Sequence, residues 1–148
     1  MTLFEMEKPM ASPTYVLSQC PSASVCAIAA QALDYVTPHT IEMISGPKVA
    51  MVQLRLKESV AETVFNAGEV LVTETRLELN GTFGFGMIVG NQPEFSTALA
   101  LIDALLRIPG EHTVLLEEQI ACLAAELQHR QHAQFAASNS TKVEFDTF

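Results

Sequence analysis

Histidine is the residue type in this sequence best suited to acid–base chemistry or metal binding, and four histidines occur. His129 and His132 are three residues apart, so a helix would place their imidazoles on one side, where they could share a metal ion. The surrounding Gln-rich segment supplies no third ligand, which favours solvated cations near a helix end. His39 and His112 fall in connections, and each is either an acid–base group or a surface residue. Neither has a partner nearby in sequence, which favours the surface interpretation.

The three cysteines indicate packing rather than chemistry. Their number is odd and no Cys-x-x-Cys occurs, so neither a disulfide framework nor a zinc site is predicted. Cys26 and Cys122 lie among Ala, Ile and Leu and are expected in the core, whereas Cys20, next to Pro21, is expected to be exposed. Reduced thiols are typical of a cytoplasmic protein, which is the location we expect.

The carboxylates do not cluster into an active site. Glu69, Glu74 and Glu78 lie on one expected strand, and Glu69 follows a Gly-containing bend. Glu69 is either an acid–base group or simply the charge at a strand end. The sequence contains no G-x-G-x-x-G motif, no P-loop and no nucleophile elbow. We therefore predict no catalytic, cofactor-binding or metal-binding residue on this chain.

The net charge of −9, from 8 basic and 17 acidic residues, limits the partners of the chain. An acidic chain repels phosphate backbones, which disfavours nucleic-acid binding. The same repulsion applies to a nucleotide or a phosphonate. If such an anion is the substrate, a partner would have to supply most of the cationic groups.

A chain of 148 residues predicts one domain, which we place at 12–148 after a mobile tail at 1–11. The tail lacks the apolar core of a signal peptide, and no apolar run reaches the ~20 residues that a membrane helix needs. The hydrophobic fraction of 49% and the mean hydropathy of +0.25 are high for a soluble domain. They indicate either a subunit interface or merely an Ala- and Val-rich core.

Helical periodicity and local caps predict four helices. Ser12 is expected to cap the first helix, Ile108-Pro109-Gly110 to end the third, and Thr113 to cap the fourth. The expected ranges are 14–19, 22–35, 93–107 and 113–127, with 128–140 as weaker helix or loop.

Strand patterns fill the middle of the chain. Expected strands cover 40–45, 50–57, 68–79 and 83–89, with a turn at 46–48 and a bend at 66–68. In 50–57 the residues on one face are all apolar, which predicts a half-buried strand. These residues are Ala50, Val52, Leu54 and Leu56. The fold class is therefore α+β, a mainly antiparallel β-sheet with helices packed on one face.

The hairpin around Asn80-Gly81 has two possible registers. A two-residue turn would set Glu78 against Phe83 and Arg76 against Phe85, mixing charges with aromatics on one face. A three-residue loop would instead set Leu77 against Phe83, giving a coherent apolar face. We predict the three-residue loop, because a one-residue slip moves every side chain to the other face.

Two glycines at alternate positions, Gly84 and Gly86, weaken a strand. On the predicted register they share a face with Glu74, Arg76 and Glu78. They either admit the close approach of another backbone or an aromatic ring, from this chain or a partner, or merely add twist.

Four stretches resemble, in order, the PhnG family of the bacterial carbon–phosphorus lyase system. They are Phe65-Asn66-Ala67-Gly68-Glu69-Val70-Leu71-Val72-Thr73, Gly84-Phe85-Gly86-Met87-Ile88-Val89-Gly90, Ala100-Leu101-Ile102-Asp103-Ala104-Leu105-Leu106 and Thr141-Lys142-Val143-Glu144-Phe145. The chain departs from the family pattern at Cys122, where a proline is expected, and at Asp146, where an aromatic is expected. A short basic or Gly-containing extension after Phe148 is also expected from the family.

The resemblance implies a non-catalytic subunit that joins PhnH-, PhnI- and PhnL-type partners. With MgATP and an alkylphosphonate such as methylphosphonate, that system displaces adenine from the ribose C1 and forms ribose 1-methylphosphonate 5-triphosphate. Catalysis is expected on the PhnI-type subunit, and a PhnJ-type radical iron–sulfur subunit later cleaves the carbon–phosphorus bond. No cofactor is expected on this chain.

The expected partner contacts are the bend, the Gly-containing sheet face and the 141–147 arm, which would add a strand to a partner. The candidate residues are Phe65, Asn66, Gly68, Glu69, Gly84, Gly86, Lys142, Val143, Glu144 and Phe145. Two alternatives stay open. One is a stand-alone homodimeric module that binds a small molecule or a protein, and the other is a small enzyme that uses Glu69 or His39.

Overall fold

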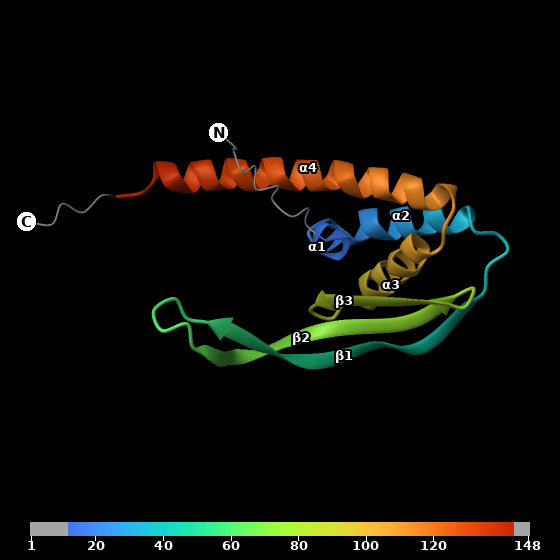
Figure 1. Cartoon of the computed structure of the whole chain (residues 1–148), viewed down its shortest axis with the longest axis horizontal. Coiled ribbons are helices and arrows are strands. Elements are labelled where there is room, and N and C mark those ends of the chain that lie inside the picture. The colour runs from blue at the N-terminus through green and yellow to red at the C-terminus, as the bar shows by residue number, and fades with distance from the viewer. Residues whose placement is uncertain (1–11, 144–148) are drawn as a thin grey trace, which may run out of the picture.

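A computed structural model describes residues 12–143. The elements in chain order are α1 (Pro13–Ser18), α2 (Ser22–Asp34), β1 (Ile41–Lys57), β2 (Val64–Leu79), β3 (Thr82–Val89), α3 (Pro93–Arg107) and α4 (Glu111–Ser140). The strands form one antiparallel sheet in the order β1-β2-β3, and α3 packs on β2 and β3 (Figure 1). Helices α1, α2 and α4 lie on the far side of α3 from the sheet. The α+β prediction, with helices on one sheet face, is confirmed.

The β2–β3 hairpin has the two-residue turn, so the predicted three-residue loop is wrong. Leu79 pairs with Thr82 and Leu77 with Gly84. Asn80 and Gly81 form the turn with φ of 50° and 80°, as the hairpin turn with two positive φ values requires. One sheet face therefore does mix charges with aromatics. A cation–π contact stabilises this mixture, because the Arg76 guanidinium lies 5.7 Å from the centroid of the Phe85 ring.

The physical reason for this register is the close approach of α3 to the sheet. Gly84 and Gly86 face α3, and a Cβ on Gly86 would lie 2.1 Å from the carbonyl oxygen of Ser96. A Cβ on Gly84 would lie 2.2 Å from the carbonyl oxygen of Ala100. The other register would place aromatic rings in this space. The two glycines are thus buried against a helix of the same chain, rather than open to a partner.

Polar contacts fix the position of α3 on the sheet. The buried hydroxyls of Thr75 and Ser96 are 2.7 Å apart. Asp103 accepts the backbone N–H of Phe85 at 2.9 Å through its carboxylate and also contacts Arg107 at 3.1 Å. The Ile102-Asp103-Ala104-Leu105 stretch therefore supplies both buried apolar side chains and a cap for the free edge of β3.

Strand β1 is one continuous element, so the predicted turn at 46–48 is wrong. Its pairing shifts between Ser45 and Lys48, where Gly46 and Pro47 form a bulge rather than a turn. Strand β2 is likewise continuous through the predicted bend. There, Leu54 pairs with Gly68 and Arg55 with Asn66, so Ala67 is the extra residue of a bulge.

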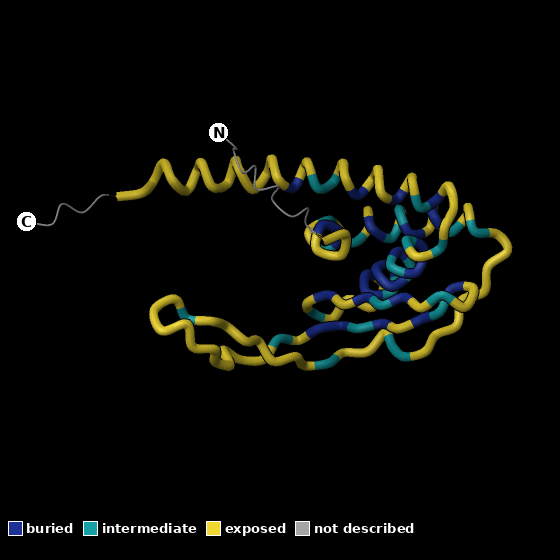
Figure 2. Tube along the Cα trace, viewed as in Figure 1, coloured by how far each residue is buried: buried dark blue, intermediate teal, exposed yellow. Residues whose placement is uncertain are grey.

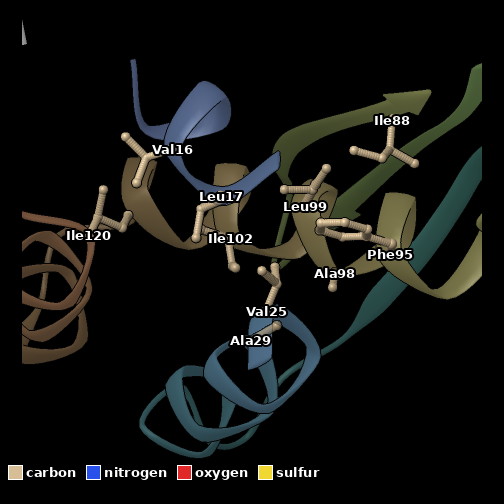
Figure 3. Packing of buried hydrophobic residues seen from close by; sticks show 10 residues of the cluster. All are labelled: Val16, Leu17, Val25, Ala29, Ile88, Phe95, Ala98, Leu99, Ile102 and Ile120. Carbon is tan, nitrogen blue, oxygen red and sulfur yellow. The ribbon is translucent and has the colours of Figure 1, made fainter. Parts of the chain in front are cut away.

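The core surrounds α3, which packs against the sheet on one side and against the other helices on the other. Ser12 caps α1 through its hydroxyl, which accepts the N–H of Tyr15, as predicted. Figure 3 shows side chains from α1, α2, β3, α3 and α4 meeting in one cluster. Its buried members are Val16, Leu17, Val25, Ala29, Ile88, Phe95, Ala98, Leu99, Ile102 and Ile120.

Helix α4 begins earlier and ends later than predicted. It starts at Glu111 after Gly110, so Thr113 lies inside the first turn and its hydroxyl donates to the carbonyl of Ile108 at 2.6 Å. His112 is buried, with Nε2 3.1 Å from the carbonyl oxygen of Leu105, so its predicted surface position is wrong. The second half of α4, 128–140, is helical although every residue in it is exposed.

Candidate partner interface

Strands β1 and β2 continue past the end of β3 and form a two-strand ribbon, which we define as residues 51–57 and 64–71. The ribbon projects to the same end of the molecule as the second half of α4 (Figure 1). Apart from Val70, which is half-buried, every residue of the ribbon is exposed (Figure 2). An isolated pair of strands is marginally stable in water, so a ribbon of this kind is expected to gain stability when another chain covers it.

One face of the ribbon carries a continuous apolar stripe. Val52 pairs with Val70, Leu54 with Gly68 and Leu56 with Phe65, all on the sheet face opposite α3. Leu54, Leu56 and Phe65 are 44%, 45% and 47% exposed. We call Val52, Leu54, Leu56, Phe65 and Val70 the outer stripe.

The other ribbon face is mixed. It pairs Met51 with Leu71 and Gln53 with Glu69, and the Arg55 guanidinium donates to the Asn66 amide oxygen at 3.4 Å. A contiguous apolar surface beside polar groups is typical of protein–protein contacts.

The tip of the ribbon is ordered by one carboxylate. Glu58 accepts the backbone N–H groups of Val60 and Ala61 at 2.9 and 2.6 Å. These hydrogen bonds lower the pKa of the Glu58 carboxyl group. Because that pKa is lowered on folding, the contribution of Glu58 is complete above the ordinary glutamate range and is lost as the pH falls through the lowered pKa. At neutral pH these hydrogen bonds therefore stabilise the tip, where Val60 is 92% exposed.

The structure brings only some of the sequence-predicted interface residues together. Phe65, Asn66, Gly68 and Glu69 lie side by side on β2 in the ribbon and are exposed. Gly84 and Gly86 lie under α3, away from the ribbon. Lys142 and Val143 are exposed just after α4, while Glu144 and Phe145 lie outside the described residues.

The exposure of the outer stripe on β1 was not predicted, because alternation shows which residues share a face but not whether anything covers that face. Ala50, Val52, Leu54 and Leu56 do share a face, as predicted, but nothing among residues 12–143 covers the last three. The signal that was available lies on the paired strand, β2. Its continuous apolar run Val70-Leu71-Val72 is typical of strands that are covered on both faces.

The remaining histidines and the cysteines lie apart from the ribbon. His39, His129 and His132 are exposed, and no group of three or more potential metal ligands occurs within residues 12–143. Cys122 is exposed and Cys20 is partly buried, so the predicted positions of these two thiols are wrong. Cys26 is also partly buried.

The thiols are expected to react at different rates. Burial raises the pKa of the Cys20 thiol, Glu126 adds to this effect and Arg130 opposes it. A higher pKa leaves less thiolate at a given pH. A disulfide reagent near pH 7.5 should therefore label Cys122 first, and labelling of Cys20 should accelerate only at higher pH. Mass spectrometry of peptides quenched over time measures the order, and equal initial rates at Cys20 and Cys122 would contradict it.

The surface hollows formed by residues 12–143 include two on the helical side. One is lined by residues that include Gln31, Tyr35 and His112, and the other lies between α2, α3 and Pro47. Neither of these two hollows is lined by lysine or arginine. No helix in the described part of the chain is long and apolar enough to cross a membrane.

A small α+β domain that exposes this much apolar strand surface is typical of proteins that bind other protein chains. The family model of the phosphonate metabolism protein PhnG matches residues 11–148. The chain therefore belongs to the PhnG family, as the four sequence stretches indicated, and its role is in phosphonate metabolism.

Proposed function

We propose that this protein is a non-catalytic subunit of the carbon–phosphorus lyase complex. In this role it supports transfer of an alkylphosphonate to the ribose C1 of ATP, with release of adenine. Its partners would be PhnH-, PhnI-, PhnJ- and PhnL-type subunits in the cytoplasm. MgATP would be used by the assembled complex rather than held by this chain alone.

The observation that carries the proposal is the exposed ribbon. Its outer stripe joins Leu54, Leu56 and Phe65 in one apolar surface, and Val60 stands exposed at the tip. Removing such side chains from water contributes about 25 cal/mol per Å² of apolar area, so covering the ribbon would favour the binding of a partner. The net charge of −9 also supports a division of labour in which partners supply the cations for ATP and phosphonate.

The test is co-expression with PhnH-, PhnI-, PhnJ- and PhnL-type subunits, followed by size-exclusion chromatography with mass determination. We expect this chain to elute within one large particle. A chain that elutes alone while the other subunits assemble would contradict the proposal. Hydrolysis of a nucleotide or a phosphonate ester by the pure chain, lost in Glu69→Gln, would instead favour the small-enzyme alternative.

A further inference from the structure

Strand β1 has a free edge. It is the first strand in the order β1-β2-β3, and no element within residues 12–143 pairs with its outer side. The other sheet edge, on β3, is partly capped by Asp103. A free edge of this length leaves backbone N–H and C=O groups ready to pair with an added strand.

The charges along β1 specify what kind of strand would fit. From residue 43 to 57 the strand carries Lys48, Arg55 and Lys57 and no acidic residue. Lys48 is paired with Glu74 at 3.1 Å, and Lys57 with Glu62 at 3.0 Å. The Lys57–Glu62 pair is more than half exposed and so contributes little to stability.

Arg55 makes no ion pair within the described part of the chain, and its side chain hydrogen-bonds the Asn66 amide oxygen. A second β1 would bring like charges together, whereas an acidic strand would not.

One segment of this chain has the complementary pattern. Glu144 and Asp146 alternate with Val143 and Phe145 in the sequence. In an extended segment, the two carboxylates would lie on one face and the two apolar side chains on the other. Paired with β1, the segment would set its carboxylates beside Arg55 and Lys57 while Phe145 extended the outer stripe.

The segment that binds this edge must come from another molecule. Val143 lies only three residues after the end of α4, and α4 is separated from the sheet by the layer that contains α3. Stacked layers lie about 10 Å apart, so α4 and the sheet are about 20 Å apart. The four residues from Ser140 to Glu144 span at most about 14 Å. A segment paired with β1 would need its backbone within about 5 Å of the strand from Val143 onward, and the three residues from Ser140 to Val143 are too short for this within one chain.

We propose that residues 143–147 of one copy bind the free edge of β1 in a second copy as an added strand. Reciprocal exchange of two such segments gives a closed dimer with two-fold symmetry. This inference does not rest on the proposed function, because it involves only this chain.

Charge reversal tests the dimer in the purified full chain. One variant carries Arg55→Glu with Lys57→Glu, and the other carries Glu144→Lys with Asp146→Lys. In each variant alone, the added segment and the β1 edge would carry charges of the same sign. Each variant should therefore dimerise roughly 100-fold more weakly than the unmodified chain. Mixed together, each segment meets an edge of opposite charge, so the mixture should regain the dimer. Sedimentation velocity over a concentration series measures all four samples.

Several outcomes would overturn the inference. An unmodified chain that stays monomeric at high concentration would do so, as would variants that dimerise normally or a mixture that stays monomeric. Circular dichroism checks that the variants fold, which we expect because Arg55 and Lys57 are exposed. As a second measurement, a peptide of residues 141–148 should bind a chain ending at Ser140, and a peptide with Glu144→Lys and Asp146→Lys should not.

Discussion

Replacing Leu54 and Leu56 together by glutamate is expected to remove this protein from its assembly while leaving the domain folded. Both side chains belong to the outer stripe and are about half exposed, so the isolated domain loses little when they become polar. In an interface, each charge would have to be buried without a partner. Burying an unpaired charge costs several kcal/mol, so binding should weaken by at least roughly 100-fold.

The measurement is the yield of co-purified partner subunits, with the urea midpoint of the isolated variant as a check of folding. The matched control is Tyr35→Glu with Val114→Glu, which charges two apolar side chains that are 60% and 55% exposed on the helical side. The control should co-purify normally. Equal losses in the two variants, or normal co-purification of the ribbon variant, would show that the outer stripe is not the contact surface.

The largest effect on stability is expected at Gly86. Gly86→Ala would place a Cβ 2.1 Å from the Ser96 carbonyl oxygen and 2.5 Å from the backbone nitrogen of Ala100. Both atoms are helix backbone, so α3 must move away from the sheet. Overpacking typically costs 1–3 kcal/mol, and we expect about 3 kcal/mol here because no flexible side chain can yield.

Urea unfolding followed by circular dichroism measures this cost. Met87→Ala is the matched control, because Met87 is next in the chain but lies on the exposed face. It should change the free energy of unfolding by less than about 1 kcal/mol. A loss below 1 kcal/mol in Gly86→Ala would mean that α3 does not approach β3 as closely as described.

The helices could be predicted from the sequence because their signals are local. Ser12 and Pro13 mark the start of α1, and Ile108-Pro109-Gly110 separates α3 from α4. The second half of α4 was underestimated, because 128–140 lacks an apolar stripe. Its helical form is consistent with its Ala, Gln and Arg content.

The hairpin register could not be predicted in the same way, because it depends on a contact between distant residues. A coherent apolar face favours the wrong pairing when β2 and β3 are considered alone. The correct pairing follows only when α3 is placed against Gly84 and Gly86. The burial of His112 has a similar origin, since its acceptor is the carbonyl of Leu105 in the preceding helix.

The candidate interface was predicted only in part, for a related reason. The 65–69 segment was predicted as a partner contact and is exposed in the ribbon, whereas its partner strand was expected to be half-buried. Alternation of apolar and polar residues shows which side chains share a face of a strand, but not what packs against that face. Leu54 and Leu56 were therefore expected to face the core of this chain. In the structure they are about half exposed.

The central claim is that the ribbon becomes buried when this protein assembles. Hydrogen exchange with mass spectrometry tests it directly, by comparing the isolated chain with the chain in the co-purified complex. We predict that amides in 51–57 and 64–71 exchange quickly in the isolated chain, at concentrations low enough to keep it monomeric, and at least about tenfold more slowly in the complex, while amides of α2 change little. Unchanged exchange in the ribbon, with protection elsewhere, would contradict the account.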